Sequence, residues 1–139
     1  ETAQFHADWF AEYDSRYHAK TAELIRKGQA HTDEEVAAAK MYKTKVREHL
    51  LSLMDAHGID CWISPSATGP APHGLESTGN PIMNLPWTNA GLPTLTIPTG
   101  FNEAGLPLGL QLTGRWQADE TLFTNGKLIE KYFRHELHE

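Results

Sequence analysis

The 139-residue chain has few of the features that mark secreted, membrane or nucleic-acid-binding proteins. It has a single cysteine, Cys61, so an internal disulfide is excluded, and we expect a reducing, cytoplasmic location. No apolar run approaches the roughly 18 residues needed to span a bilayer, so we expect no membrane partner. The net charge is -6, with 12 basic residues scattered among 18 acidic ones, which argues against nucleic acid as a partner.

Motifs that hold cofactors or metals are also missing. The sequence contains no glycine-rich phosphate-binding loop, and we expect no cofactor. The histidines of the segment 135–138, His-Glu-Leu-His, are three residues apart, whereas a zinc helix of the His-Glu-x-x-His type places them four apart. The other histidines show no ligand spacing, so we expect no metal site. They are His6, His18, His31, His49, His57 and His73.

Residues 1–57 are expected to be helical. The range 5–29 is predicted to form one helix with an aromatic face, because its apolar residues fall at helical spacing. These residues are Trp9, Tyr13, Tyr17 and Leu24. Thr32 and Glu35 have the spacing of a capping box, which predicts a second helix that runs to Gly58. The apolar stripe of this second helix is Ala39, Tyr42, Val46, Leu50, Leu53 and Met54.

The helical period stops at Gly58, and residues 58–117 are expected to form a sheet, a long loop and a hairpin. The range 59–63 is short, β-prone and apolar, which predicts a strand covered on both faces. Five prolines and three glycines in the range 64–86 exclude a long helix or a central strand. Unstructured loops of this length are uncommon in compact domains and usually bind ligands, so this loop is the expected ligand-facing part.

The remaining elements are a short helix, a β-hairpin and a C-terminal helix. Asn84 is expected to cap the short helix, which ends at Gly91. The hairpin has alternating apolar residues, and Pro98 predicts a bulge in its first strand. These apolar residues are Leu95, Ile97, Leu108, Leu110 and Leu112. The range 118–134 is expected to hold the C-terminal helix, with Asp119 as its cap. The predicted fold class is therefore α/β.

Three residues are candidates for a nucleophile: Cys61, Ser64 and Ser66. A nucleophile needs a base within hydrogen-bond reach and donors for the oxyanion, and the chain has no Gly-x-Ser-x-Gly elbow. We therefore favour structural roles for all three residues.

Three stretches together carry a resemblance to a known family. They are DCWI followed by SPSATGPAPHG, then MNLPWTNAGLPTLTIPTGF, then GLPLGLQLTGRWQADETLF. This pattern, from Gly58 to about Ile129, resembles the C-terminal part of the amidase signature family, serine hydrolases that cleave carboxamide bonds. The resemblance implies part of a central mixed β-sheet between layers of helices, to which the hairpin contributes supporting strands.

The resemblance also implies a catalytic mechanism whose residues are elsewhere. In the family, a lysine, a serine in a cis peptide and a nucleophilic serine in a glycine-rich segment act together, and all three belong to the earlier part of the chain. No Gly-Gly-Ser-Ser-Gly segment is present here, so we assign no catalytic residue and expect the isolated chain to be inactive.

The loop around Ser66 and Thr68 corresponds to a segment near the family's substrate entrance. With Trp87, these residues are the candidate substrate-binding wall, although a tryptophan in a short apolar helix is more often a core residue. Asn89 matches a recurrent asparagine of the family. We favour a buried side chain that ties the turn to neighbouring backbone over a substrate contact.

We therefore expect residues 1–139 to be a single domain or fragment, and the start at Glu1 reads as a cut. The expected partners are a small-molecule amide, bound by the parent enzyme, and the rest of the parent chain. Unpaired strand edges and the exposed faces of Trp9, Tyr13 and Tyr17 predict a homo-oligomer when the chain is isolated. Two alternatives stay open: a self-sufficient, non-catalytic α/β interaction or binding module, and a subunit of an amidotransferase that acts on charged transfer RNA.

Overall fold

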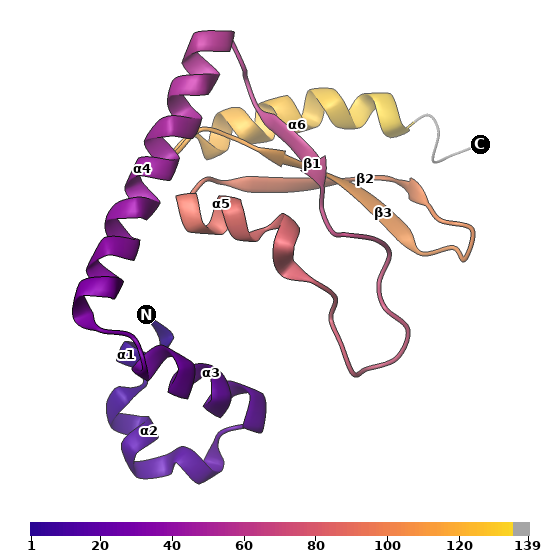
Figure 1. Cartoon of the computed structure of the whole chain (residues 1–139). Coiled ribbons are helices and arrows are strands. Elements are labelled where there is room, and N and C mark those ends of the chain that lie inside the picture. Colours follow the sequence, from indigo (N-terminus) through magenta and orange to yellow (C-terminus); the bar gives the residue numbers. More distant parts are fainter. Residues whose placement is uncertain (135–139) are drawn as a thin grey trace. The chain divides into compact units, whose positions relative to one another are not determined.

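This computed structural model describes residues 1–134 of the chain (Figure 1). Its contacts divide the chain into two units, Glu1–Tyr42 and a second unit that starts at Lys43. The division falls within helix α4 (Asp33–His57), so α4 contributes residues to both units.

The first unit contains short helical segments before the start of α4. They are α1 (Thr2–Phe5), α2 (Ala7–Tyr13), the 3-10 turn η1 (Asp14–Arg16) and α3 (Ala19–Gln29). The prediction of one helix over 5–29 is therefore wrong. The chain becomes extended at Tyr17, with ψ of 141°, and the side chain of His18 then accepts a hydrogen bond from the N–H of Lys20 at the start of α3.

The breaks in the helix change which residues are buried in the first unit. The core consists of Ala3, Phe10, Ala22 and Ile25, with Tyr17 packed against it. Trp9 and Leu24, expected on a shared face, are 54% and 57% exposed. The prediction of an aromatic face assumed one continuous helix through a segment that is not helical. It therefore missed Phe10.

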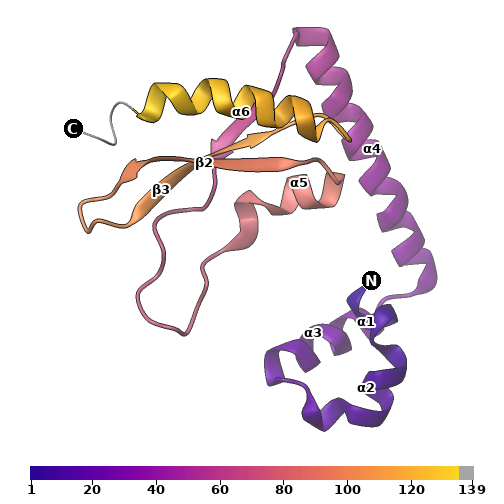
Figure 2. The same cartoon turned by 180° about the vertical axis from the view of Figure 1, so that it is seen from behind.

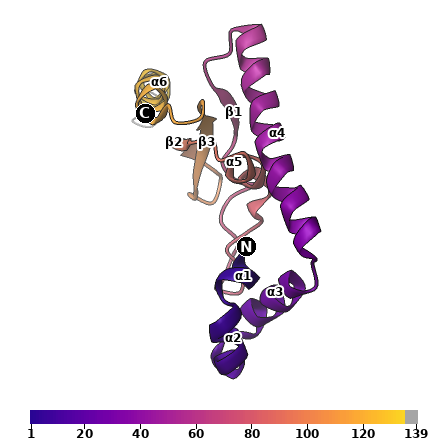
Figure 3. The same cartoon turned by 90° about the vertical axis from the view of Figure 1, so that its left-hand side faces the viewer.

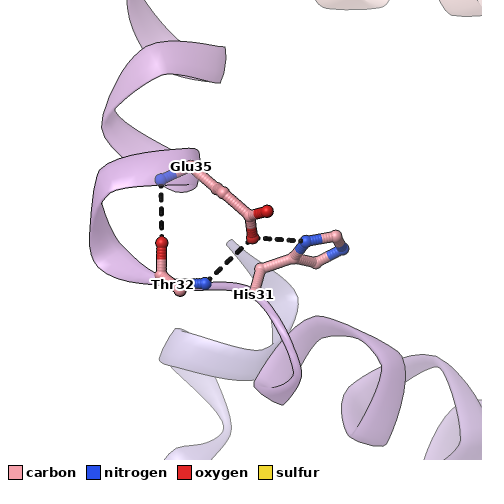
Figure 4. Close-up of polar contacts among 3 residues, drawn as sticks. All are labelled: His31, Thr32 and Glu35. Carbon is pink, nitrogen blue, oxygen red and sulfur yellow. Dashed lines mark hydrogen bonds and ion pairs between the residues drawn. The ribbon is translucent and has the colours of Figure 1, made fainter.

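The capping box predicted before α4 is confirmed (Figure 4). The backbone N–H of Glu35 donates to Thr32 Oγ1 at 3.2 Å, and the N–H of Thr32 donates to Glu35 Oε2 at 3.0 Å. His31 Nδ1 lies 3.1 Å from the same carboxylate oxygen. The backbone hydrogen bond from Thr32, followed by the contact with His31, lowers the pKa of Glu35.

The predicted second helix is confirmed as α4, and Gly58 follows it with φ of 62°, a conformation that favours glycine. Its apolar stripe is only partly covered. Met54 is fully buried, whereas Ala39 and Tyr42 are exposed. The remaining stripe residues are half-buried: Val46, Leu50 and Leu53.

The second unit contains a three-stranded antiparallel sheet in the order β1-β3-β2 (Figure 2). The strands are β1 (Trp62–Pro65), β2 (Thr94–Phe101) and β3 (Pro107–Thr113). The predicted hairpin is confirmed as β2 and β3, and the expected bulge appears as a register shift between Pro98 and Gly100. Together with the helices, this sheet confirms the α/β class.

The first strand differs from its prediction. It lies at Trp62–Pro65 instead of 59–63, and within the described residues it pairs only with β3. Ile63 is 64% exposed, so this part of the chain does not cover both faces of the strand.

Helices lie on both faces of the sheet in the second unit. Figures 1 and 3 show α6 (Asp119–Arg134) along one face and α5 (Leu85–Ala90) along the other. Helix α6 approaches β2 closely at Gly126. A Cβ at this position would overlap the side chain of Leu95. The predicted C-terminal helix and the predicted short helix are both confirmed, the short helix ending at Gly91 with φ of 70°.

The expected capping role of Asn84 is wrong. It precedes α5, but its side chain makes no cap hydrogen bond to that helix. Instead its Nδ2 lies 3.5 Å from the carbonyl oxygen of Ser66. The side-chain amide of Asn84 therefore bonds to a residue distant in sequence and not to the start of α5.

Candidate functional site

The long loop predicted after the first strand is confirmed. Between β1 and the 3-10 turn η2 (Pro81–Met83), residues 66–80 form neither helix nor strand (Figure 1). Residues 67–80 are all exposed. The loop therefore has little packing of its own, and its position depends on how its two ends are held.

Hydrogen bonds join both ends of the loop to the central strand β3, and a further hydrogen bond joins the two ends. Ser66 donates two hydrogen bonds to the carbonyl oxygen of Gly109, from its N–H at 3.2 Å and from Oγ at 3.1 Å. At the far end, Gln111 Nε2 lies 3.3 Å from the carbonyl oxygen of Met83. The contact of Asn84 with Ser66 joins the two ends directly.

An open groove of about 660 Å³ lies beside this loop base. Its lining is mostly apolar and includes Met83, Leu108, Leu110 and Phe133. The polar side chains among the described lining residues all carry hydroxyl groups, and none of these residues is charged. Such a surface suits an uncharged molecule with apolar groups, which hydroxyls could orient by hydrogen bonds.

The structure brings two of the three predicted substrate-binding residues together. Ser66 and Thr68 both line the groove. Trp87 does not line it; its side chain is half-buried in α5, and its indole N–H is buried without a hydrogen-bond partner among the described residues. Asn89 is exposed, so the expectation of a buried asparagine there is wrong.

Within residues 1–134, the hydroxyls of Ser64 and Ser66 bond to groups that are not bases. The Ser66 hydroxyl donates to a carbonyl oxygen, and the Ser64 hydroxyl accepts from Gln111 Nε2 at 3.4 Å. Cys61 lies in a separate groove with Asp60 and residues of α6. Burial, and then the charge of Asp60, raise the pKa of the Cys61 thiol, which keeps it protonated at neutral pH.

Residues 1–134 hold neither a metal-binding cluster nor a membrane-spanning helix. Within that range, no group of three or more His, Cys, Asp or Glu side chains is placed to hold a metal ion. The same range contains no helix with the length and apolar character required to cross a bilayer. The histidine pair of segment 135–138 lies outside the described residues.

Sequence reasoning missed Gln111 as a residue that shapes the site. Gln111 alternates with Leu110 and Leu112, so it lies outside the set of apolar residues that the pattern identified. It is nevertheless 2% exposed, and its amide contacts the carbonyl oxygen of Met83 in η2. A polar side chain inside a strand that is covered on both faces is the signal that could have identified it.

Residues 5–123 match the family model described as Amidase. The chain therefore belongs to the amidase signature family, which confirms the resemblance seen in the sequence.

Similar proteins include curated amidotransferase subunits that are much longer than this chain. The chain is 40% identical over 85 residues to a subunit of Glutamyl-tRNA(Gln) amidotransferase from Methylocella silvestris, covering 55% of this chain and 17% of that protein. It is 41% identical over 71 residues to the corresponding subunit from Nostoc sp., covering 46% of this chain and 15% of that protein. The chain thus spans about a sixth of the length of these relatives.

Solved structures of amidases share the fold. An amidase crystal structure matches with a TM-score of 0.81 and 26% identity, over 94% of this chain and 32% of that chain. A bacterial aryl acylamidase of the amidase signature family matches with a TM-score of 0.61 and 18% identity, over 87% of this chain and 29% of that chain. The second likeness shows the fold alone.

Proposed function

We propose that this chain is the C-terminal part of an amidase that hydrolyses carboxamide bonds, and that its catalytic serine, bridging serine and lysine lie outside these 139 residues. The observation that carries the proposal is the match of 94% of this chain to 32% of an amidase crystal structure, at a TM-score of 0.81. The hydroxyls of Ser64 and Ser66 bond to no base among the described residues, which supports it.

In this proposal the hairpin supports the reaction through packing. Ile97 and Leu112 are 4% and 0% exposed, and they anchor β2 and β3 beneath helix α6. A rigid sheet holds the groove beside β1 in one shape, which preorganises a binding surface without contributing a reacting group.

The groove is proposed to be part of the substrate entrance. The Ser66 and Thr68 hydroxyls lie where they could hydrogen-bond to a carboxamide, and the apolar lining would accept its substituent. Trp87 stays a candidate for the same wall, although it does not line the groove in this part of the chain.

The direct test compares the full-length parent with this chain alone. The coding sequence upstream of Glu1 would be recovered, and both proteins would be assayed over a panel of amides. We expect hydrolysis by the parent and none by the isolated chain. Turnover by the chain at an enzymatic rate, with contamination excluded, would overturn the placement of the catalytic groups.

Variants of the parent test the entrance residues. We expect Thr68→Val and Ser66→Ala to raise KM several-fold with kcat nearly unchanged, since they remove binding contacts and not reacting groups. Trp87→Phe is included as the third candidate. A KM that stays at the parent value in all three variants would remove this groove from the substrate path.

The relatives favour a second candidate, in which the parent belongs to an amidotransferase. The 40% identity to the Glutamyl-tRNA(Gln) amidotransferase protein of Methylocella silvestris supports this reading for the parent. Amide transfer to glutamyl-tRNA(Gln) by the parent with its partner subunits would select it over a free amidase. A non-catalytic binding module is the third candidate. It predicts that the coding sequence upstream of Glu1 encodes no catalytic lysine and no paired serines.

We also propose that the isolated chain self-associates. The outer edge of β1 pairs with no other described strand, and Phe5 and Trp9 are 74% and 54% exposed. Exposed strand edges and aromatic faces promote association between copies. A single monomeric species at micromolar concentration in sedimentation velocity would contradict this.

A further inference from the structure

A single buried amide contacts both ends of the long loop. Gln111 lies on the central strand β3, directly opposite Ser64 on β1 and Thr96 on β2. Its side chain is almost entirely buried, with 2% exposure for the residue. Nε2 lies 3.4 Å from the Ser64 hydroxyl and 3.3 Å from the carbonyl oxygen of Met83.

These two acceptors belong to different segments of the groove wall. Ser64 is on β1, two residues before the loop, and Met83 ends the 3-10 turn that follows the loop. Both residues line the groove of about 660 Å³, whereas Gln111 itself does not. The amide therefore lies behind the wall and bonds to both of its sides.

The chemistry of a glutamine amide fits this arrangement. An NH₂ group has two donor hydrogens, so one nitrogen can serve two acceptors at the same time. A buried carbonyl that loses its donor costs about 1–3 kcal/mol, since water does not readily replace the partner. Without Gln111, the carbonyl oxygen of Met83 would lose this donor. Met83 would then leave its position more easily.

We infer that Gln111 is a positioning residue for substrate binding, which sets the separation of the two groove walls by holding Ser64 and Met83 through one amide nitrogen. It acts through these residues and touches no substrate. The inference rests on the proposed function, because it takes the groove to be the substrate entrance.

The test uses Gln111→Met, which keeps length and volume but removes both donors. The matched control is Thr113→Val on the same face of β3, where a buried hydroxyl has no hydrogen-bond partner among the described residues. Gln111→Asn serves as a second variant if the methionine variant does not fold, since it keeps the amide but shortens its reach. Circular dichroism and thermal melting establish folding for each.

Two measurements are made on these variants. In the full-length parent, we expect Gln111→Met to raise KM for an amide substrate about tenfold, the loss typical of a buried hydrogen bond, with kcat within about twofold. In this chain alone, hydrogen exchange reports on the Asn84 N–H, which donates to the carbonyl oxygen of Pro81 at 2.8 Å within η2. We expect about tenfold faster exchange at this position. Thr113→Val should change neither quantity.

The outcomes separate this inference from the proposed function. If the parent hydrolyses amides but KM stays unchanged in Gln111→Met, or kcat falls as much as KM rises, the positioning role is wrong and the proposed function stands. If the parent hydrolyses no amide, the proposed function fails together with the role in substrate binding. The hydrogen-exchange rate of the Asn84 N–H then decides whether Gln111 holds Met83 in place. An unchanged rate in Gln111→Met overturns that role as well.

Discussion

Ser66 donates both its backbone N–H and its side-chain hydroxyl to one carbonyl oxygen, that of Gly109, at 3.2 and 3.1 Å. This contact holds the first residue of the long loop against the central strand. The glycine at 109 leaves room for this contact, because a Cβ there would lie 2.6 Å from Thr96 Cγ2 and 3.0 Å from Ser66 Oγ. The loop base and the hairpin therefore depend on each other.

Replacing Gly109 with alanine should destabilise the chain. We expect Gly109→Ala to lower the free energy of unfolding by about 1–3 kcal/mol, because the new methyl group overlaps its neighbours. Gly69→Ala is the matched control, since nothing lies within 4 Å of a Cβ at that loop position. Urea denaturation measures both. Equal stability of the two variants would show that the strand and loop can separate without cost.

A second prediction concerns Arg47 of α4, whose guanidinium lies over the ring of Trp116 at 4.3 Å from the centroid. We expect Arg47→Ala to cost about 1 kcal/mol of unfolding free energy, through the lost cation–π contact and the lost packing of the side-chain stem.

Arg115 provides a control on the neighbouring surface. It pairs with Asp55 at 2.6 Å, but the two side chains are 37% and 70% exposed. Exposed pairs contribute little, so Arg115→Ala should cost about 0.5 kcal/mol or less. Thermal melts of both variants test the order, and a larger loss for Arg115→Ala would contradict it.

A third prediction concerns the pH dependence of the capping box. The pKa of Glu35 is lowered by hydrogen bonding to the Thr32 N–H and then by His31. A lowered pKa in the folded state stabilises the fold above the ordinary glutamate value of about 4.3, and this contribution disappears as the pH falls through the lowered value.

The variant Glu35→Gln isolates this contribution. Glutamine can serve the same capping position without titrating. The difference in melting temperature between the original chain and Glu35→Gln should therefore shrink as the pH is lowered from about 6 to below about 4. A difference that is constant over this range would exclude Glu35 as the titrating group.

A fourth prediction concerns Cys61, whose pKa is raised by burial and then by the charge of Asp60. A raised pKa leaves less thiolate at a pH of about 8, so the thiol should react with iodoacetamide more slowly than an unhindered cysteine in a peptide. Asp60→Asn removes one cause and should accelerate the reaction. A rate that is unaffected by Asp60→Asn would leave burial as the sole cause.

Local patterns succeeded where the interactions that decide a structure are close in sequence. The capping box of Thr32 and Glu35 uses atoms three residues apart, and the bulge near Pro98 follows from its missing N–H donor. The hairpin of β2 and β3 joins neighbouring strands, and its alternation was therefore readable. The family pattern between Gly58 and Ile129 was readable for the same reason, as an ordered series of short motifs.

Prediction failed where distant residues decided the result. The helix expected over 5–29 is broken into several segments, and Tyr17, extended between two of them, packs against the small core with Phe10, which helical spacing could not indicate. Asn84 bonds to Ser66 instead of capping α5. Trp87 does not line the groove that Ser66 and Thr68 line, and its place in a substrate-binding wall stays a prediction.

The sequence by itself determined the α/β class, the family and the positions of α4, the hairpin, α5 and α6, because period, caps and turn residues act over a few neighbours. Only the tertiary structure decided how the loop base is held. Gln111 contacts partners 47 and 28 residues away, and the burial that makes those contacts important exists only after β1, β3 and η2 have come together.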